Sequence, residues 1–575
     1  MALFKESIAK ALRLELKEKD FSLEQATEFL EKPPKAEMGD YSLPCFRLAK
    51  AFQQSPAQIA NQLQVKLASK KISGIEKIEA IGGYLNFFVE KKALAETVLN
   101  TVLKEKQKYG QNYSGKKQTV MIEYSAPNSN KPLHIGHLRN QSIGMALVRT
   151  FEANGYKVVK ANLVNDRGIH ICKSMLAYQK WGKEETPKSS GLKGDHLVGK
   201  YYVLFAQKAK ENPRLEEEVL KMLKKWEADD KAVRALWKKM DAWAQQGFSE
   251  TYKLFGSEFD KVYKESELYD KAGPIVQKAL EKGIFEKEED GSVIARLKNH
   301  GLSDKIALRK DGTSIYLTQD LVLTPTKFKD FKLDKAFWIV ASEQDLYFRQ
   351  LFKIFELLGE PWAKNCVHVN YGLVNLPSGR LKSREGITVD ADDLIEEMKQ
   401  LALKEIKKRH AKISEKEAEK RALLIALAAI KFFLVKTEFQ KNLLFNPKES
   451  LSFEGETGPY VLYSYARAKS ILRKAKGTKE KIRFDTLKSA PEKKLLALLQ
   501  SFPTVVEKIP INFSLHSLAQ FLLELAAGFN SFYHELPVLN AEPETRTARL
   551  ALVEATAWVL HNGLEMLDIQ SIEQM

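Results

Sequence analysis

The spacing of hydrophobic residues changes along the chain, and these changes predict where strands and helices alternate. Residues 120–124 form a largely apolar run typical of a buried strand, and residues 138–152 carry apolar positions at helical spacing. Gly155 follows that stretch in the manner of a C-cap, and residues 156–164 form a second strand-like run. A strand, a helix and a strand in this order make a βαβ unit, which predicts a parallel sheet with a right-handed crossover.

The same patterns divide the chain into three regions. Residues 1–113 combine helical patterns with the strand-like IEAIGGYLNFFVE and predict a small α/β domain. Residues 114–395 hold the βαβ unit and a charged helical insertion at about 178–291. They also hold strand-like runs at VIARL, KIALRK, SIYLTQD, AFWIVAS and VHVNYGLV, which we assign to the second half of the same open sheet. Residues 396–575 are amphipathic helices. The fold class is therefore α/β, with a Rossmann-type parallel-sheet core between a small α/β domain and an all-α domain.

The charge balance of the chain indicates what kind of molecule it could bind. The 91 basic and 74 acidic residues give a formal net charge of +17. Such a charge favours a polyanion such as nucleic acid, although a generic basic surface would explain it equally well. No apolar run has the length of a membrane span, and the first residues lack a signal-peptide block, so we expect a cytoplasmic protein with no membrane partner. The three cysteines lie far apart in no metal-ligand spacing, so we expect no structural metal.

Two histidines flank a glycine in PLHIGHLRN, where the first strand gives way to the helix. In an open parallel sheet this place binds ligands, and the helix N-terminus attracts anions. His134 and His137 could donate N–H groups to a phosphate, while Gly136 leaves room for a nucleotide near the backbone. On the motif alone, a histidine pair that only caps and packs the turn is the simpler explanation.

The wider sequence resembles one family. HIGH matches the first signature of class I aminoacyl-tRNA synthetases, and SAPNSNKPLHIGHLRN resembles that of the arginyl-tRNA synthetases. GDYSLPCFRLAK and GGYLNFF resemble the family's amino-terminal domain. NLVNDRG, RKDGTSIYLTQDL and VASEQDLYF resemble its catalytic core, and GPYVLYSYARAKSILRK and LAAGFNSFYHELPVL resemble its anticodon-binding domain. The resemblance covers nearly the whole chain and keeps the family's order.

The resemblance implies a function. A cytoplasmic monomer would attach L-arginine to tRNA(Arg) through an arginyl-adenylate, using ATP with Mg²⁺ and releasing AMP and pyrophosphate. Residues 1–113 would bind tRNA, residues 114–395 would carry the catalytic site, and residues 396–575 would bind the anticodon. The directed polar contacts of a guanidinium make an editing domain unnecessary. The insertion would be structural or would contact the tRNA acceptor stem.

The resemblance also assigns roles to individual residues. The arginine pocket would be formed by Glu123, Asn128, Tyr316, Asp320 and Gln344. ATP would contact His134, Gly136, His137, Leu373, Val374, Lys382 and Ser383. Tyr460, Tyr463, Arg467, Tyr533 and Met575 would meet the anticodon, and Asn86 the tRNA elbow. Without the resemblance, Tyr316 and Asp320 would be a capping or surface pair and the tyrosine stripe would be core. On the strand of Asn86 we prefer that residue to Tyr84 and Phe88, which could equally be core.

The second class I signature departs from the family pattern. The usual Lys-Met-Ser-Lys-Ser aligns with residues 380–384, and Ser383 stands where the second lysine would stabilise the ATP phosphates. Lys382 and Arg384 are catalytic candidates beside His134 and His137. Lys131, just before the first signature, is a candidate substitute for the missing lysine.

Two alternatives remain open at this point. Another class I synthetase, for cysteine, glutamine or glutamate, would share the first signature, although cysteine specificity normally brings zinc ligands that this sequence lacks. A catalytically inactive RNA-binding paralogue would explain the altered second signature, but not the intact histidine pair.

Overall fold

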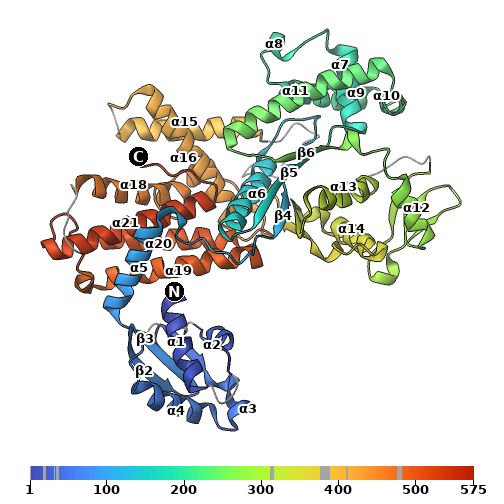
Figure 1. Ribbon diagram of the computed structural model, residues 1–575. Coiled ribbons are helices and arrows are strands. Elements are labelled where there is room, and N and C mark those ends of the chain that lie inside the picture. Colours follow the sequence, from blue (N-terminus) through green and yellow to red (C-terminus); the bar gives the residue numbers. More distant parts are fainter. Residues whose placement is uncertain are drawn as a thin grey trace.

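The computed structural model describes residues 2–16, 21–31, 33, 38–310, 316–375, 389–409, 412–475 and 482–575. Figure 1 shows a small N-terminal unit set apart from the rest, a central sheet, and a large group of C-terminal helices. The helix α5 (Lys91–Glu105) leads from the N-terminal unit to the C-terminal helices. No helix of the described residues is both long and apolar enough to cross a membrane.

The N-terminal unit is an antiparallel sheet with helices packed on it. Its strands lie in the order β1-β3-β2, with bounds Tyr41–Pro44, Tyr84–Val89 and Ile75–Ile81. The helices are α1 (Ala2–Glu15), α2 (Leu23–Phe29), α3 (Ala49–Phe52) and α4 (Pro56–Ala68). Ser22 and Ser55 are the N-caps of α2 and α4 and form capping boxes. In each box the serine side chain accepts from the backbone N–H of a glutamine three residues later, and the glutamine side chain accepts from the serine N–H.

A five-stranded parallel sheet forms the centre of the molecule. The strand order is β11-β10-β4-β5-β6, with bounds Cys366–Tyr371, Lys335–Ala341, Thr119–Glu123, Lys157–Val164 and Lys261–Lys264. Helix α6 (Ile135–Ala153) connects β4 to β5, which confirms the predicted βαβ unit and Rossmann-type core. The strand order reverses between β4 and β10, and their carboxyl ends are where such sheets bind ligands.

The segment after β5 departs from the sequence prediction. Five helices come first: α7 (Ile169–Trp181), α8 (Pro187–Ser190), α9 (Gly194–Glu211), α10 (Arg214–Glu227) and α11 (Lys231–Phe255). The chain then returns to the central sheet as β6, inside the span predicted to be helical. After α12 (Gly273–Glu281), β7 (Phe285–Lys287), β8 (Val293–Ala295) and β9 (Lys305–Leu308) form a separate antiparallel sheet.

Three of the predicted strand-like runs therefore do not belong to the parallel sheet. VIARL and KIALRK form strands, but these pair in the small antiparallel sheet rather than in the parallel one. In SIYLTQD, the described residues from Tyr316 onward begin helix α13 (Tyr316–Phe331). Helix α14 (Asp345–Leu358) then separates β10 from β11. A short apolar run suits a strand or a buried helix equally, and its partner is set by distant parts of the chain.

The C-terminal region is helical, as predicted. Its helices are α15 (Ala391–Arg409), α16 (Glu415–Val435), α17 (Pro447–Ser450), α18 (Gly458–Lys474), α19 (Ala490–Asn512), α20 (Leu515–Glu535) and α21 (Pro543–Met566). A two-residue strand, β13 (Leu443–Leu444), pairs with β12 (Val374–Asn375). Helix α6 packs against α16 and α19, so one apolar core runs from the central sheet into the helices.

Candidate functional site

His134 and His137 shape the start of α6 with their own side chains. The Gly136 N–H donates to His134 Nδ1 at 3.1 Å, and the His134 N–H donates to His137 Nδ1 at 3.1 Å. Because Nδ1 accepts in both neutral rings, the ring proton of each lies on Nε2. A Cβ on Gly136 would lie 2.9 Å from His134 Cε1, so a larger residue would displace that ring. The pair therefore caps the helix and still has an Nε2–H donor on each ring.

The surroundings keep these rings neutral. Burial, assisted by the charge of Lys131, lowers the pKa of His134 to about 3. Burial also lowers the pKa of His137 well below its usual value, again with Lys131 contributing. Lys131 itself is half-buried, and that burial lowers its pKa. Two neutral N–H donors and one lysine thus meet at the carboxyl end of β4, where a helix N-terminus already favours an anion.

Leu373 and Val374 lie beside this start of α6. Leu373 is held by its backbone: its N–H donates to Asn442 Oδ1 at 2.7 Å, and its C=O accepts from the Leu443 N–H at 2.8 Å. Alternate residues of a strand direct their backbone polar groups to opposite edges. The N–H and C=O of Val374 therefore face away from β13.

Arg139 is a residue of this region that the sequence analysis missed. It is fully buried and donates to Gly372 O at 2.6 Å, Phe439 O at 2.9 Å and Lys441 O at 3.0 Å. A charged side chain is rarely buried without such partners, because desolvating it is costly. Arg139 thus fixes the loop before β12 to α6. The signal was present in the sequence as an arginine on the buried face of a helix.

Lys382, Ser383 and Arg384 lie outside the described residues. The chain that follows them pairs directly with the first signature. The Ile135 N–H donates to Val389 O at 3.1 Å, and the Ala391 N–H donates to Leu133 O at 3.0 Å. His134 and Asp390 form an antiparallel bridge between these bonds.

The predicted arginine-binding acids come together from different elements. Glu123 ends β4 and lies 2.5 Å from Lys327 Nζ in a buried ion pair. Asp320, on α13, accepts a hydrogen bond from the Tyr347 hydroxyl, and both Glu123 and Lys327 act on its charge. Burial raises the pKa of Asp320 to about 6. Asp320 is thus a largely desolvated carboxyl that accepts a hydrogen bond from a neutral phenol.

A third acid, the buried Glu265, lies beside this pair and was not predicted. Burial, and then the charges of Asp166 and Asp320, raises its pKa well above the usual value. Arg167 partly offsets this charge. Several carboxylates that share a desolvated space favour the entry of a cation, since a cation lowers the cost of ionising them. The sequence offered no signal for Glu265, because β6, which it directly follows, lies in the span predicted to be helical.

The remaining predicted pocket residues are Tyr316, Asn128 and Gln344. Tyr316 stands one turn before Asp320 on α13 and is 59% exposed. Asn128 follows β4 and bridges to Asn165 after β5. Gln344 is exposed directly before α14, beyond the end of β10. All three thus lie at the carboxyl edge of the sheet or at the start of an adjoining helix.

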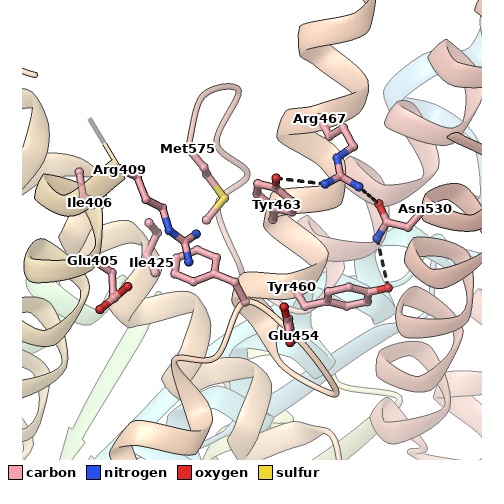
Figure 2. A pocket seen from close by; sticks show the side chains of 11 residues that line it. Glu405, Ile406, Arg409, Ile425, Glu454, Tyr460, Tyr463, Arg467, Asn530 and Met575 are labelled. Atoms are coloured by element: carbon pink, nitrogen blue, oxygen red, sulfur yellow. Dashed lines mark hydrogen bonds between the residues drawn. The ribbon is translucent and has the colours of Figure 1, made fainter. Parts of the chain in front are cut away.

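Four of the five predicted anticodon residues, all except Tyr533, line a cavity of about 590 Å³ in the C-terminal region (Figure 2). Its walls are Glu405, Ile406, Arg409, Ile425, Phe453, Glu454, Tyr460, Tyr463, Arg467, Asn530 and Met575. Arg467 donates to Asn530 Oδ1 at 2.7 Å and to the Tyr463 hydroxyl at 3.0 Å. The Arg467 guanidinium carbon lies 5.5 Å from the ring of Tyr533, which is 43% exposed. The tyrosine stripe therefore lines a cavity rather than filling a core.

The structure buries Asn86, the residue preferred as the tRNA-elbow contact, and exposes Tyr84 instead. Asn86 is 4% exposed, and its Oδ1 accepts a hydrogen bond from Ser42 Oγ at 2.7 Å. Tyr84 is 41% exposed and packs edge-to-face against Phe46, with ring centroids 5.3 Å apart. Register along β3 predicts which residues share a face, whereas the segments that pack on that face determine which of them is covered.

The cavity leads to a first prediction. Replacing Tyr463 or Arg467 with alanine should weaken tRNA charging by about 1–3 kcal/mol if bases stack there. The measurement is kcat/KM for tRNA, with wild-type transcripts and transcripts altered in the anticodon. Tyr465→Ala on the buried side of the same helix is the matched control, and it should lower Tm without selectivity among anticodons. An equal drop in Tm and no anticodon selectivity for Tyr463→Ala would contradict the prediction.

Comparisons with known proteins agree with this geometry. The family described as tRNA synthetases class I (R), catalytic domain, matches residues 98–446. The DALR anticodon binding domain matches residues 461–575, and the arginyl tRNA synthetase N terminal domain matches residues 2–89.

Whole-chain relatives are equally consistent. An arginine-tRNA ligase of Treponema denticola is 44% identical over 557 residues, covering 95% of this chain and 94% of that protein. One of Parabacteroides distasonis is 40% identical over 572 residues, covering 95% of each. The solved arginyl-tRNA synthetase of Thermus thermophilus superposes with a TM-score of 0.82 at 27% identity, covering 99% of each chain. The chain therefore belongs to the arginyl-tRNA synthetases, the class I enzymes that attach arginine to tRNA in translation.

Proposed function

We propose that the chain activates L-arginine with ATP to form arginyl-adenylate and pyrophosphate, and then transfers the arginyl group to tRNA(Arg) with release of AMP. The observation that carries this proposal is that two different sites share one edge of the sheet. Neutral histidine donors with Lys131 lie at the start of α6, and the acids Glu123 and Asp320 lie at the end of β4 and on α13. We also propose that the enzyme is cytoplasmic and monomeric.

Adenylate formation needs in-line attack of the arginine carboxylate on the α-phosphate. Such a transfer requires positioning and charge stabilisation, and no covalent enzyme intermediate. His134 and His137 donate their Nε2–H groups to the phosphate oxygens as negative charge grows there. Lys131 adds a positive charge on the same side, and the backbone of Val374 holds the adenine. Mg²⁺ accompanies ATP as part of the substrate complex.

Arginine is selected by the buried acids. A guanidinium presents five donors in a planar fork, which carboxylates match best. Lys327 neutralises the charge of Glu123, whereas Asp320 accepts a hydrogen bond from a neutral phenol hydroxyl. Asp320 is therefore the carboxylate whose charge the substrate guanidinium stabilises most. Glu265 lies behind it and adds to the negative potential. Tyr316, Asn128 and Gln344 complete the contacts to the side chain, amino group and carboxylate of arginine.

Three units share the work. Residues 1–113 bind the tRNA elbow, with Tyr84 and Phe46 as the exposed aromatic pair. Residues 114–395 carry out the chemistry, and the helices α7–α11 within them are structural or contact the acceptor stem. Residues 396–575 bind the anticodon in the cavity lined by Tyr460, Tyr463 and Arg467. The net charge of +17 suits contact with a polyanion over several of these surfaces.

The decisive experiment is ATP-pyrophosphate exchange with each amino acid, with and without tRNA(Arg). Arginine alone should support exchange, because its planar guanidinium matches the Asp320 carboxylate within the negative potential that Glu265 adds. Exchange should need tRNA, as the resemblance to a family that activates its amino acid on the tRNA complex implies. His134→Ala serves as the control that the activity belongs to this chain. Robust exchange with lysine or glutamine would contradict the assignment of arginine as the substrate. No exchange with any amino acid would favour a catalytically inactive paralogue.

A further inference from the structure

A cluster of charged residues joins the helical insertion to the segment that pairs with His134. Lys193 and Asp195 lie at the start of α9, with His196 next to them. Thr251 lies on α11, and Asp392 lies in the first turn of α15. We call these residues, together with Asp390, the insertion clamp.

Hydrogen bonds within the insertion clamp converge on Asp392. Lys193 Nζ donates to Asp392 Oδ2 and, at 2.6 Å, to Thr251 Oγ1. Thr251 Oγ1 in turn donates to Asp392 Oδ1 at 2.9 Å. His196 Nε2 lies 3.2 Å from Asp392 Oδ2 and 3.3 Å from Asp390 Oδ2. Two elements of the insertion, α9 and α11, are thus tied to the start of α15.

Asp390 connects the clamp to the catalytic histidine. Its Oδ1 accepts from the Asp392 N–H at 2.8 Å, which caps the first turn of α15. Its backbone is bridged to His134, and the flanking residues exchange the hydrogen bonds described above. A shift of Asp390 would therefore displace the backbone segment that pairs with His134. The position of the His134 ring depends on three elements that are distant in sequence.

The clamp is not a metal site in this arrangement. Asp195, His196 and Asp392 have ligand atoms within 4.8 Å of one another. However, Lys193 Nζ contacts Asp392 and lies 3.4 Å from Asp195 Oδ2, so its ammonium group supplies the cation that these acids need. Asp195 is fully buried, and a buried carboxylate requires such a partner. The charges of the clamp therefore serve to hold elements together.

We propose that Lys193, His196 and Thr251 are positioning residues for adenylate formation, which act through Asp390 and Asp392 to set His134 at the α-phosphate. The inference rests on the proposed function, in which His134 donates to that phosphate. Because catalysis of this transfer depends on placement, a displacement of about 1 Å can cost up to 10²-fold in rate. The arginine pocket lies on other elements, so arginine binding should not depend on the clamp.

The protonation of His196 supports this role. The hydrogen bond to Asp392, together with the charges of Asp390 and Asp195, raises the pKa of His196, while its burial and Lys193 act in the opposite direction. A histidine whose folded pKa is raised contributes fully below its ordinary pKa of about 6.5 and loses its contribution as pH rises through the folded value. Burial raises the pKa of Asp195 to about 6 and that of Asp390 above its usual value, so these two carboxyls are also titratable groups that face His196.

The test compares Lys193→Met, Lys193→Arg and His196→Gln with wild type in tRNA-dependent, arginine-dependent pyrophosphate exchange. Lys353→Met is the matched control, since Lys353 lies on α14, outside the insertion, in an exposed pair with Glu356. Lys193→Met should lower kcat by about 10-fold or more with KM for arginine little changed. Lys193→Arg should recover most of the rate. The wild-type rate should fall at alkaline pH, and His196→Gln should abolish that fall.

Each other outcome overturns the proposal in a distinguishable way. If wild type shows exchange and Lys193→Met keeps its kcat, the clamp has no positioning role. A loss of Tm with unchanged kcat per folded molecule means a structural role only. If Lys193→Met does not fold, the pH profile of His196→Gln decides, and an alkaline fall that persists belongs to another group such as Lys131. If wild type itself shows no exchange, the proposed function is wrong, and so is the positioning role of the clamp that rests on it.

Discussion

Replacement of Lys131 by alanine is expected to lower kcat for adenylate formation by about 10² or more, the loss typical of one preorganised charge donor. The pentavalent phosphate needs a positive charge, and Ser383 stands where the family's second lysine would supply it. Lys131 is half-buried, and its charge acts on both His134 and His137. KM for arginine should change little, because the charge acts on the phosphate in flight.

The measurement is the single-turnover rate at saturating arginine, ATP and tRNA. Ser383→Lys should partly rescue Lys131→Ala while changing the wild type little, so the two substitutions should couple in a double-mutant cycle. Lys180→Ala, an exposed lysine of the insertion paired with Glu218, is the control. A nearly silent Lys131→Ala, or simple additivity, would instead assign the charge to Lys382 or Arg384.

Asp320→Asn is expected to raise KM for arginine by at least ~30-fold, since removing one partner of a buried charged pair costs about 2 kcal/mol or more. The change keeps the shape of the side chain and leaves an amide whose N–H groups would oppose the guanidinium. The nearby Glu123 cannot compensate, because Lys327 already neutralises it. The kcat at saturating arginine should fall much less, because Asp320 contacts the side chain rather than the reacting atoms.

The pH dependence of arginine binding gives a second readout for the same residue. Burial raises the pKa of Asp320 to about 6, so the wild-type carboxyl becomes neutral as pH falls through that value. KM for arginine should therefore rise below about pH 6 in wild type, and Asp320→Asn should lose this dependence. Asp330→Asn, an exposed residue on the same helix, is the matched control. An unchanged KM in Asp320→Asn would place the guanidinium elsewhere.

Much of the fold could be predicted because it is encoded locally. The period of apolar residues around 120–164 predicted the βαβ unit, and PLHIGHLRN marked the start of its helix. The Tyr460, Tyr463 and Arg467 spacing placed three side chains on one helical face, and the structure lines a cavity with them. Local backbone preference, side-chain periodicity and capping depend on neighbours within a few residues, which is the range over which a sequence pattern is informative.

Contacts between distant segments were decided only by the tertiary structure. SIYLTQD was assigned to a strand but enters α13, which brings Asp320 to Glu123, and β6 returns to the sheet and carries Glu265 with it. Asn86 is buried, with a hydrogen bond from Ser42 of β1. Arg139 is buried because it donates hydrogen bonds to four backbone carbonyls of distant loops. The sequence alone determined which residue types were available and the local elements that carry them. Which of those residues are desolvated, and which charge each one meets, depends on long-range packing, because burial and pairing arise only when separate elements come together.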